Sequence, residues 1–186
     1  MNFMNDMSSV LINQRELDSK IEELGKLLTE EYEGKRPIAV CILKGSTIFY
    51  SDLLRKMNCE VQMDFIIASS YVGTKSSREV VIKKDLENDI NGRHVLLVED
   101  IIDSGNTLFC LKQELLKRNP ASLKIVTLMN KQARREVDIS ADWFGFDIPD
   151  EFVVGFGLDY NEKYRNVPFV GVLKHEIYDK SCTESR

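Results

Sequence analysis

The stretch from Val95 to Thr107 constrains the fold more than any other part of the sequence. It opens with Val95-Leu96-Leu97-Val98, an apolar run typical of a fully buried strand, and continues through small residues at 104–107 into a helical pattern. The backbone N–H groups of such a loop and the start of its helix form a concavity that suits a phosphate. Glu99 and Asp100 stand at the strand end, where carboxylates can accept hydrogen bonds from sugar hydroxyls or hold a magnesium ion through water. The stretch therefore predicts a site for a phosphorylated ribose.

A simpler interpretation of the same residues needs no ligand. Asp103 or Ser104 would cap the helix, and Glu99 and Asp100 would form a solvated strand end. Small-residue turns between a strand and a helix are common, so their spacing alone leaves both interpretations open.

Apolar runs alternate with helical patterns along the chain. Beside the run at 95–98, buried strands are expected at 38–43 and 123–129, and a strand that starts with alternating apolar residues is expected at 61–68. Helices are expected between Asn13 and Gly34, after Ser46, and over 108–116. This order predicts an α/β fold, a doubly wound and mostly parallel sheet flanked by helices. The polar stretch at 69–78 has the composition of a mobile loop.

The composition of the sequence changes after residue 131, where aromatic residues and glycines recur along short segments. We expect short strands and loops there, folded back over the sheet as a small hood. The chain has no repeats and no linker, so nothing marks a second independent domain. We predict one domain over residues 1–186, with a core at about 35–130 and a hood at about 131–186 that includes the N-terminal residues.

Several segments that could carry chemistry each follow a predicted strand. They are Lys44, Ser70-Tyr71, the run from Glu99 to Thr107, and Lys131. Ligands of open α/β sheets bind beyond the carboxyl ends of the strands. These segments are therefore expected to converge on one rim of the sheet and to form an active site there.

The composition excludes several classes of protein. Lys and Arg total 25 against 30 Asp and Glu, and the formal net charge of −5 offers no overall attraction to nucleic acid or anionic lipid. The N-terminus lacks the features of a signal peptide, and no run approaches the ~18 apolar residues of a membrane span. The cysteines show no CxxC spacing and are interpreted as reduced apolar residues; they are Cys41, Cys59, Cys110 and Cys182. We expect a cytoplasmic protein with no membrane or nucleic-acid partner.

The motifs together resemble those of the hypoxanthine-guanine phosphoribosyltransferases, a group within the type I phosphoribosyltransferase family. The similarity spans residues from about 38 to about 173. It rests on Leu43-Lys44-Gly45, Ser70-Tyr71, Val98 to Gly105, Lys131, Phe152 to Gly155, Leu158 to Glu162, and Arg165. The resemblance implies a type I phosphoribosyltransferase fold and an enzyme of purine salvage. Its substrates would be phosphoribosyl pyrophosphate and hypoxanthine or guanine, and its products IMP or GMP and pyrophosphate.

The resemblance also implies roles for the central stretch. Asp103 matches the proposed general base, which takes or shares the proton of the purine's imidazole ring. Glu99 and Asp100 would hold the ribose hydroxyls. The 5-phosphate would lie in the loop of Ser104, Gly105, Asn106 and Thr107.

The base would be held by residues from the second half of the chain. Lys131 would donate to the 6-oxo group, which explains a preference for oxopurines because an ammonium group has only donors. Phe152 would stack on the base, and the backbone of Val153 would contact its edge. Without the resemblance, such a lysine is more often a surface charge, and a Phe-Val-Val run is more often core.

The leaving pyrophosphate would contact Lys44, Gly45 and Arg165. A magnesium ion is implied as cofactor, with Glu99, Asp100 and Asp159 as its candidate ligands. Members of the family often carry a cis peptide bond that does not involve proline at the position of Leu43-Lys44, and we expect one here.

Some implied features concern mobility and assembly. Ser70 and Tyr71 match the tip of a loop that closes over the reaction. The resemblance implies a homodimer or homotetramer. Ser46 and Asn106 depart from the family pattern, since some members carry glycine and lysine there. Arg134-Arg135 is interpreted as a small basic patch on the surface.

Two other functions compete with the transferase. A regulator with the same fold could bind RNA, but the acidic net charge and the presence of Asp103 and Lys131 argue against it. A receiver-type signalling domain also has acids at strand ends and a lysine after a later strand. The small-residue loop at 104–107 and the aromatic C-terminal region argue against that alternative.

Overall fold

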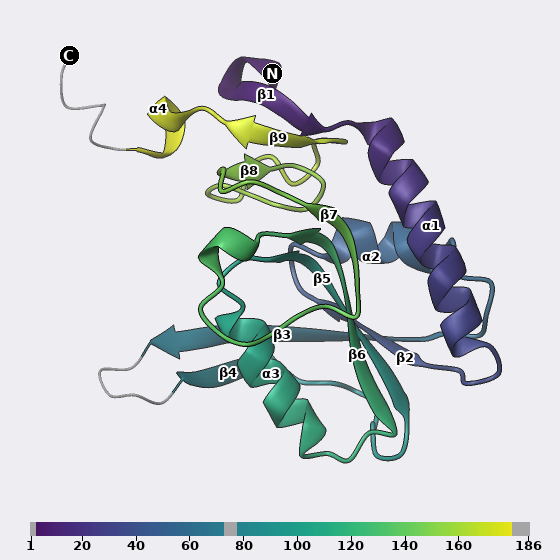
Figure 1. Cartoon of the computed structure of the whole chain (residues 1–186). Coiled ribbons are helices and arrows are strands. Elements are labelled where there is room, and N and C mark those ends of the chain that lie inside the picture. The colour runs from purple at the N-terminus through teal and green to yellow at the C-terminus, as the bar shows by residue number, and fades with distance from the viewer. Residues whose placement is uncertain (1–2, 73–77, 180–186) are drawn as a thin grey trace.

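The computed structural model describes residues 3–72 and 78–179 and contains two sheets (Figure 1). The larger sheet has six strands in the order β4-β3-β2-β5-β6-β7. All its neighbouring strands pair in parallel except β4, which is antiparallel to β3. Its strands are β2 (Ile38–Ile42), β3 (Gln62–Val72), β4 (Arg78–Lys84), β5 (His94–Ile102), β6 (Ser122–Asn130) and β7 (Trp143–Asp147). The mostly parallel sheet confirms the predicted fold class.

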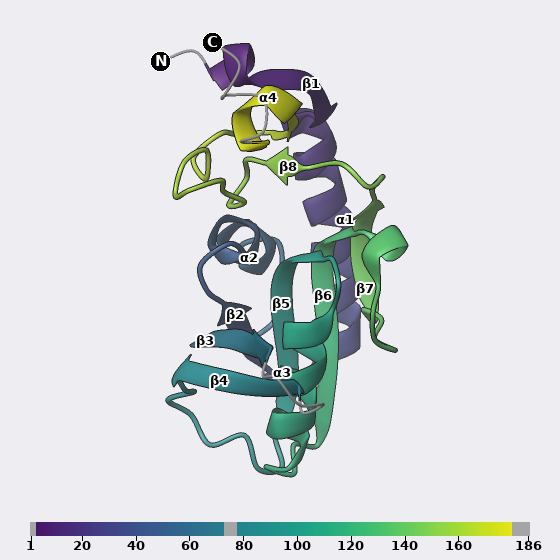
Figure 2. The ribbon, with the colours of Figure 1, turned by 90° about the vertical axis from the view of Figure 1, so that its left-hand side faces the viewer.

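Helices cover both faces of this sheet (Figures 1 and 2). Helices α1 (Gln14–Tyr32) and α2 (Thr47–Leu54) lie on one face, and α3 (Asn106–Leu116) lies on the other. Strand β5 is buried between them because its side chains alternate: Leu96 and Val98 join the core under α1 and α2, whereas Val95 and Leu97 join the core under α3. The central strand therefore sits between two apolar layers.

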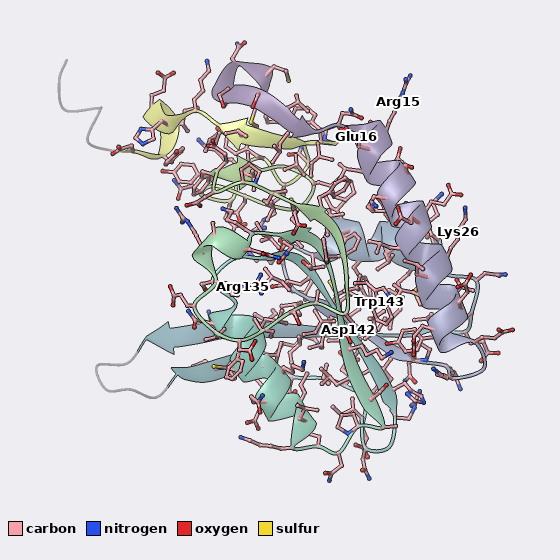
Figure 3. All side chains as sticks on the ribbon, in the orientation of Figure 1. Arg15, Glu16, Lys26, Arg135, Asp142 and Trp143 are labelled. Atoms are coloured by element: carbon pink, nitrogen blue, oxygen red, sulfur yellow. The ribbon has the colours of Figure 1, made fainter. Side chains whose placement is uncertain are left out.

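Helix α1 begins at the predicted cap. The side chain of Asn13 accepts a hydrogen bond from the backbone of Glu16, and the Glu16 side chain accepts one from the backbone of Asn13. Figure 3 labels Glu16 at the start of this helix and Trp143 of β7 beside its other end. The Trp143 ring packs against Tyr32, with 6.4 Å between ring centroids, so α1 is tied to the sheet at β7.

The smaller sheet forms the hood over the carboxyl ends of the parallel strands. It has the order β1-β9-β8, with β1 at Met7–Ile12, β8 at Val153–Val154 and β9 at Val170–Leu173. The short elements η1 (Phe3–Asp6) and α4 (His175–Tyr178) flank it, and η2 (Gln132–Arg134) follows β6. Strand β1 therefore places N-terminal residues in the hood.

Two predicted boundaries differ from the structure. The hood was expected to start near residue 131, but β7 lies inside that range and pairs with β6 of the larger sheet. A mobile loop was expected over 69–78, but Ser69–Val72 and Arg78 belong to the paired strands β3 and β4. Residues 73–77 lie outside the described part of the chain. Both segments carry residues that can extend a strand once a neighbouring strand is available.

No helix among residues 3–72 and 78–179 combines the length and apolar character needed to cross a membrane.

Asp64 is a buried carboxylate that fixes the turn after β4. It accepts hydrogen bonds from the backbone N–H groups of Phe65, Glu87 and Asn88, and from the side-chain amide of Asn88 at 2.8 Å. Burial by itself raises the pKa of Asp64, but these hydrogen bonds outweigh it and hold the pKa below its ordinary value. The ionised form of Asp64 therefore stabilises the fold.

We predict that Asp64→Ala lowers the free energy of unfolding by about 3 kcal/mol at pH 7, because three backbone N–H groups and the Asn88 side-chain amide lose their buried acceptor. Because the pKa of Asp64 is lower in the folded state, its carboxylate stabilises the fold fully above the unfolded pKa of about 3.9. This stabilisation is lost as the pH falls through the folded-state pKa. The cost of the substitution should therefore shrink at pH 3, as measured by urea denaturation at both pH values. Glu60→Ala, at a residue 85% exposed, is the control. An equal cost at both pH values would contradict the prediction.

Candidate functional site

The predicted segments meet at the carboxyl end of the parallel sheet. Lys44 follows β2, Asp103 follows β5 and Lys131 follows β6. The backbone N–H of Lys131 donates to the carbonyl of Ile102 at 3.0 Å, which holds the ends of β5 and β6 together. The convergence predicted for Lys44, the run from Glu99 to Thr107, and Lys131 is thus confirmed.

Asp100 lies buried under the turn that follows β2. A β-carbon on Gly45 would overlap Oδ2 of Asp100, so only glycine fits at this place. Burial raises the pKa of Asp100 to about 6; a hydrogen bond from the Ile101 backbone and the charge of Arg165 oppose the increase. Burial and the charge of Asp100 also raise the pKa of Glu99 well above its ordinary value. Asp100 is therefore not part of a solvated strand end, in contrast to the simpler interpretation.

The small-residue loop lines a cavity of about 140 Å³. Its walls are Glu99 and residues 101–108. Gly105 precedes the first residue of α3 and has a positive φ of 80°, and a β-carbon there would overlap the side chain of Ile139. The cavity faces the N-terminal end of α3, where backbone N–H groups and the helix dipole favour an anion.

Asn106 lies at the start of α3, and its side chain is only partly satisfied. Its amide nitrogen donates to Glu136 at 2.6 Å and to the Ser104 hydroxyl at 3.3 Å. Its amide oxygen is buried and has no partner among the described residues. Ser46, the other departure from the family pattern, is fully buried and donates to the carbonyl of Ile42 at 2.6 Å, so it acts as a packing residue.

A second cavity of about 230 Å³ adjoins the first one at Ile101 and Asp103. Lys131 is 4% exposed and reaches into this region from the end of β6. Its ammonium group donates to the carbonyl of Glu151 at 2.8 Å and lies 3.8 Å from Asp150 and 4.0 Å from Asp103. Since an ammonium group has three N–H donors, Lys131 keeps donors for a ligand in the cavity.

Asp103 stands between the two cavities and lines both of them. Its Oδ1 atom is buried and has no hydrogen-bond partner in the described part of the chain, although the side chain as a whole is 42% exposed. A buried acceptor without a donor is costly, and such an atom marks a place for a ligand proton.

Phe152 and Val153 close the second cavity from the hood. Phe152 is 36% exposed, whereas Val153 is buried in β8. The Tyr178 ring stacks on Phe152 with 4.8 Å between centroids and 18° between planes, and Tyr160 meets the same ring edge-on at 5.6 Å. Tyr178 lines the cavity as well, but no local pattern in the sequence singled it out.

The turn after β2 carries the expected cis peptide bond between Leu43 and Lys44. A β-carbon on Gly157 would overlap the carbonyl oxygen of Gly45, so the hood packs directly against this turn. Arg165 donates to the carbonyl of Gly157 at 2.8 Å and pairs with Asp159 at 2.7 Å. The structure thus brings the cations Lys44 and Arg165 to one side of Asp100.

Glu162 connects these two cations. Its Oε1 atom lies 3.2 Å from the Lys44 ammonium and 3.4 Å from the Arg165 guanidinium. Hydrogen bonds from Arg165 and Lys44 hold the pKa of Glu162 below its ordinary value. Glu162 belongs to the motif from Leu158 to Glu162 that supports the resemblance, but the sequence prediction gave it no function.

Arg135 is not part of a surface patch, in contrast to the prediction. Its guanidinium donates to the carbonyls of Ile102 and Asp103 at 3.3 and 3.2 Å, to the carbonyl of Ile139, and to the Asn130 side chain at 2.7 Å. Figure 3 shows its position beside the loop after β5. Arg135 therefore holds the carbonyl groups of both Ile102 and Asp103 in place. Arg134, by contrast, is 58% exposed and pairs with Asp150.

Ser70 and Tyr71 lie near the end of β3, where their backbone pairs with Val80 and Glu79 of β4. They continue the hairpin whose tip falls outside the described residues. A closing movement of this segment stays a prediction.

Comparisons with known proteins identify the family. The model of the phosphoribosyl transferase domain matches residues 8–161. A hypoxanthine-guanine phosphoribosyltransferase of Streptococcus thermophilus is 49% identical over 176 residues, which cover 94% of this chain and 98% of that protein. A hypoxanthine-guanine-xanthine phosphoribosyltransferase of Tritrichomonas foetus is 45% identical, with 94% and 96% covered. The solved structure of a hypoxanthine phosphoribosyltransferase from Staphylococcus aureus has a TM-score of 0.92 and 46% identity, with 95% and 97% covered.

We predict that Asp100→Asn stabilises the fold at pH 7.5 by on the order of 2 kcal/mol. A folded-state pKa raised to about 6 means that the fold loses stability as the pH rises from about 4 to 6, because the ionised carboxylate is buried. The gain should therefore vanish near pH 4. Urea denaturation in a buffer with chelator measures both values, with the exposed Asp89→Asn as control. A destabilised Asp100→Asn variant at pH 7.5 would show that the carboxylate is needed for folding.

Proposed function

The chain belongs to the phosphoribosyl transferase family, and from this premise we propose that it transfers the phosphoribosyl group of phosphoribosyl pyrophosphate to hypoxanthine or guanine. The products would be IMP or GMP and pyrophosphate, a reaction of purine salvage. The observation that carries the proposal is the unpartnered Oδ1 of Asp103, which lies between a cavity at a helix start and a cavity lined by Lys131 and Phe152. One cavity suits a phosphate, the other suits a flat oxopurine, and Asp103 faces the junction.

The base is held from three directions in this proposal. The free donors of Lys131 meet the 6-oxo group, the Phe152 ring stacks on the base, and Val153 contacts its edge through the backbone. Asp103 accepts the proton on the imidazole ring of the purine as the ring nitrogen attacks the anomeric carbon. Arg135 holds the backbone of Asp103 in place for this step.

The phosphoribosyl group is held by the other half of the site. The N–H groups at the start of α3 and the hydroxyls of Ser104 and Thr107 bind the 5-phosphate. Glu99 and Asp100 accept hydrogen bonds from the ribose hydroxyls, and their charge favours the cationic transition state at the anomeric carbon. Lys44, the backbone of Gly45, and Arg165 bind the pyrophosphate that leaves.

Magnesium is the cofactor that we propose for this site, with Asp100, Glu99 and Asp159 as candidate ligands. Among the described residues no group of three acidic, histidine or cysteine side chains could hold a metal ion by itself. The residues nevertheless fit magnesium, which is usually bound by one or two carboxylates together with phosphate oxygens of the substrate. Asp100 supports this fit, because it is a buried acid whose pKa is raised and which has Asp159 as a charged neighbour. When bound, the ion would neutralise charge on the leaving pyrophosphate.

Other expectations from the family resemblance remain proposals. They are assembly as a homodimer or homotetramer, a location in the cytoplasm, and closure of a lid that carries Ser70 and Tyr71. The free thiols of Cys41 and Cys59 are consistent with a reducing compartment.

The decisive experiment is a spectrophotometric assay with phosphoribosyl pyrophosphate and hypoxanthine, guanine, xanthine or adenine, with magnesium and with excess chelator. We expect turnover of hypoxanthine and guanine only with magnesium. Asp103→Asn should lower kcat by about 100-fold, the size of a general-base contribution. Asp138→Asn, at an exposed aspartate outside the site, is the matched control. If folded protein turns over none of the four bases, the proposed function is wrong.

We also predict that Lys131→Met raises the KM for hypoxanthine and guanine by at least about tenfold, because the 6-oxo group loses its charged donor. The KM for phosphoribosyl pyrophosphate should change little. Initial rates with one substrate varied at a time separate the two effects. An increase in the KM for phosphoribosyl pyrophosphate alone would place Lys131 at the other half of the site.

A further inference from the structure

The C-terminal helix α4 brings an aromatic side chain to the base cavity. Tyr178 is the last residue of α4 and lines the cavity together with Phe152 and Lys131. Its ring stacks on Phe152 almost in parallel, with 18° between planes and 4.8 Å between centroids. Such offset stacking is the arrangement in which aromatic rings attract each other.

The packing of the hood fixes the position of Tyr178. Helix α4 follows β9 directly, and the backbone N–H of Lys174 donates to the carbonyl of Asp6 at 3.0 Å. Ile177 and Tyr178 pack against the apolar residues of the hood, and His175 meets the Tyr178 ring edge-on at 5.0 Å. At this same end of β9, the backbone N–H of Leu173 donates to the carbonyl of Phe152 at 2.8 Å. The two stacked rings are thus held by the same small sheet.

Phe152 has few ways to move while Tyr178 is in place. Tyr178 covers one face of its ring, and Tyr160 contacts it edge-on at 5.6 Å. A base that stacks on Phe152 takes the face that Tyr178 leaves open. Because Tyr178 already restricts the Phe152 ring, the ring loses less conformational entropy when a base binds. More of the stacking energy between the ring and the base then contributes to affinity.

We propose that Tyr178 is a positioning residue for the purine: it stacks behind Phe152, so that the base binds to a wall of two aromatic rings. The inference rests on the proposed function and adds the C-terminal helix to the base site. It follows that affinity for the base, and not for phosphoribosyl pyrophosphate, depends on α4.

The test compares Tyr178→Ala, Tyr178→Leu and Tyr178→Phe with the wild type in the same assay. Loss of the aromatic pair should raise the KM for hypoxanthine up to about tenfold in the Ala and Leu variants. The kcat and the KM for phosphoribosyl pyrophosphate should stay within about twofold of the wild-type values. Tyr178→Phe should retain the wild-type KM, because it keeps the ring. Glu176→Ala, at an exposed residue of the same helix, is the control.

Each outcome of this comparison decides the proposal. An unchanged or lowered KM for hypoxanthine in both Tyr178→Ala and Tyr178→Leu overturns it, and a lowered value would show that Tyr178 obstructs the base. A Tyr178→Phe variant as weak as Tyr178→Ala also overturns it, because the hydroxyl and not the ring would matter. Affinity for GMP, measured by calorimetry, should weaken in parallel in the Leu variant, which keeps an apolar side chain for folding. Absence of any wild-type turnover would instead refute the proposed function.

Discussion

Burial of a carboxylate, that of Asp100, beside a second acid at the end of β5 is the constraint on which the site depends. Burial raises the pKa of Asp100, and desolvation and the charge of Asp100 raise the pKa of the half-buried Glu99, so the ionised pair destabilises the fold. The chain tolerates this arrangement because β5 is anchored between two apolar layers, with Leu96 and Leu97 fully buried on opposite sides. The packing of β5 thus offsets the unfavourable placement of Glu99 and Asp100 at its end.

The parts around this acid pair are packed too closely to move independently. Gly45 lies against Asp100, and Gly157 of the hood lies against the carbonyl of Gly45, with no room for a β-carbon at either glycine. Arg165 ties the hood loop together through Gly157 and Asp159. The turn, the acid pair and the hood therefore form one continuous contact. The rim of the sheet and its cover are therefore in direct contact on this side of the site.

Sequence patterns predicted the parts of the fold that are set locally. The strand, loop and helix at 95–107 and the cap at Asn13 depend on neighbouring residues, and the structure has them where the patterns indicated. Strand β7 was wrongly assigned to the hood, because its aromatic residues suit a half-buried strand in either sheet. Its pairing with β6, which is not visible in the local sequence, places it in the larger sheet. Arg134 and Arg135 are chemically identical in sequence, yet only Arg135 reaches the carbonyls at the end of β5. Tyr178 was missed because its partner, Phe152, lies 26 positions earlier in the sequence, just before β8.

The hood sheet also determines when the site can exist during synthesis of the chain. Its edge strand β1 comes from the first residues, and Ser8 bonds to Val172, 164 positions later in the sequence. The strands of the larger sheet end at Asp147, so they all leave the ribosome before β9, which begins at Val170. Strand β1 must therefore wait for nearly the whole chain before it finds the partner that it has in the structure, and closing so long a loop is slow. The nascent protein can form its central sheet early, but only β8, β9 and α4 complete the cover of the base cavity and create a competent site.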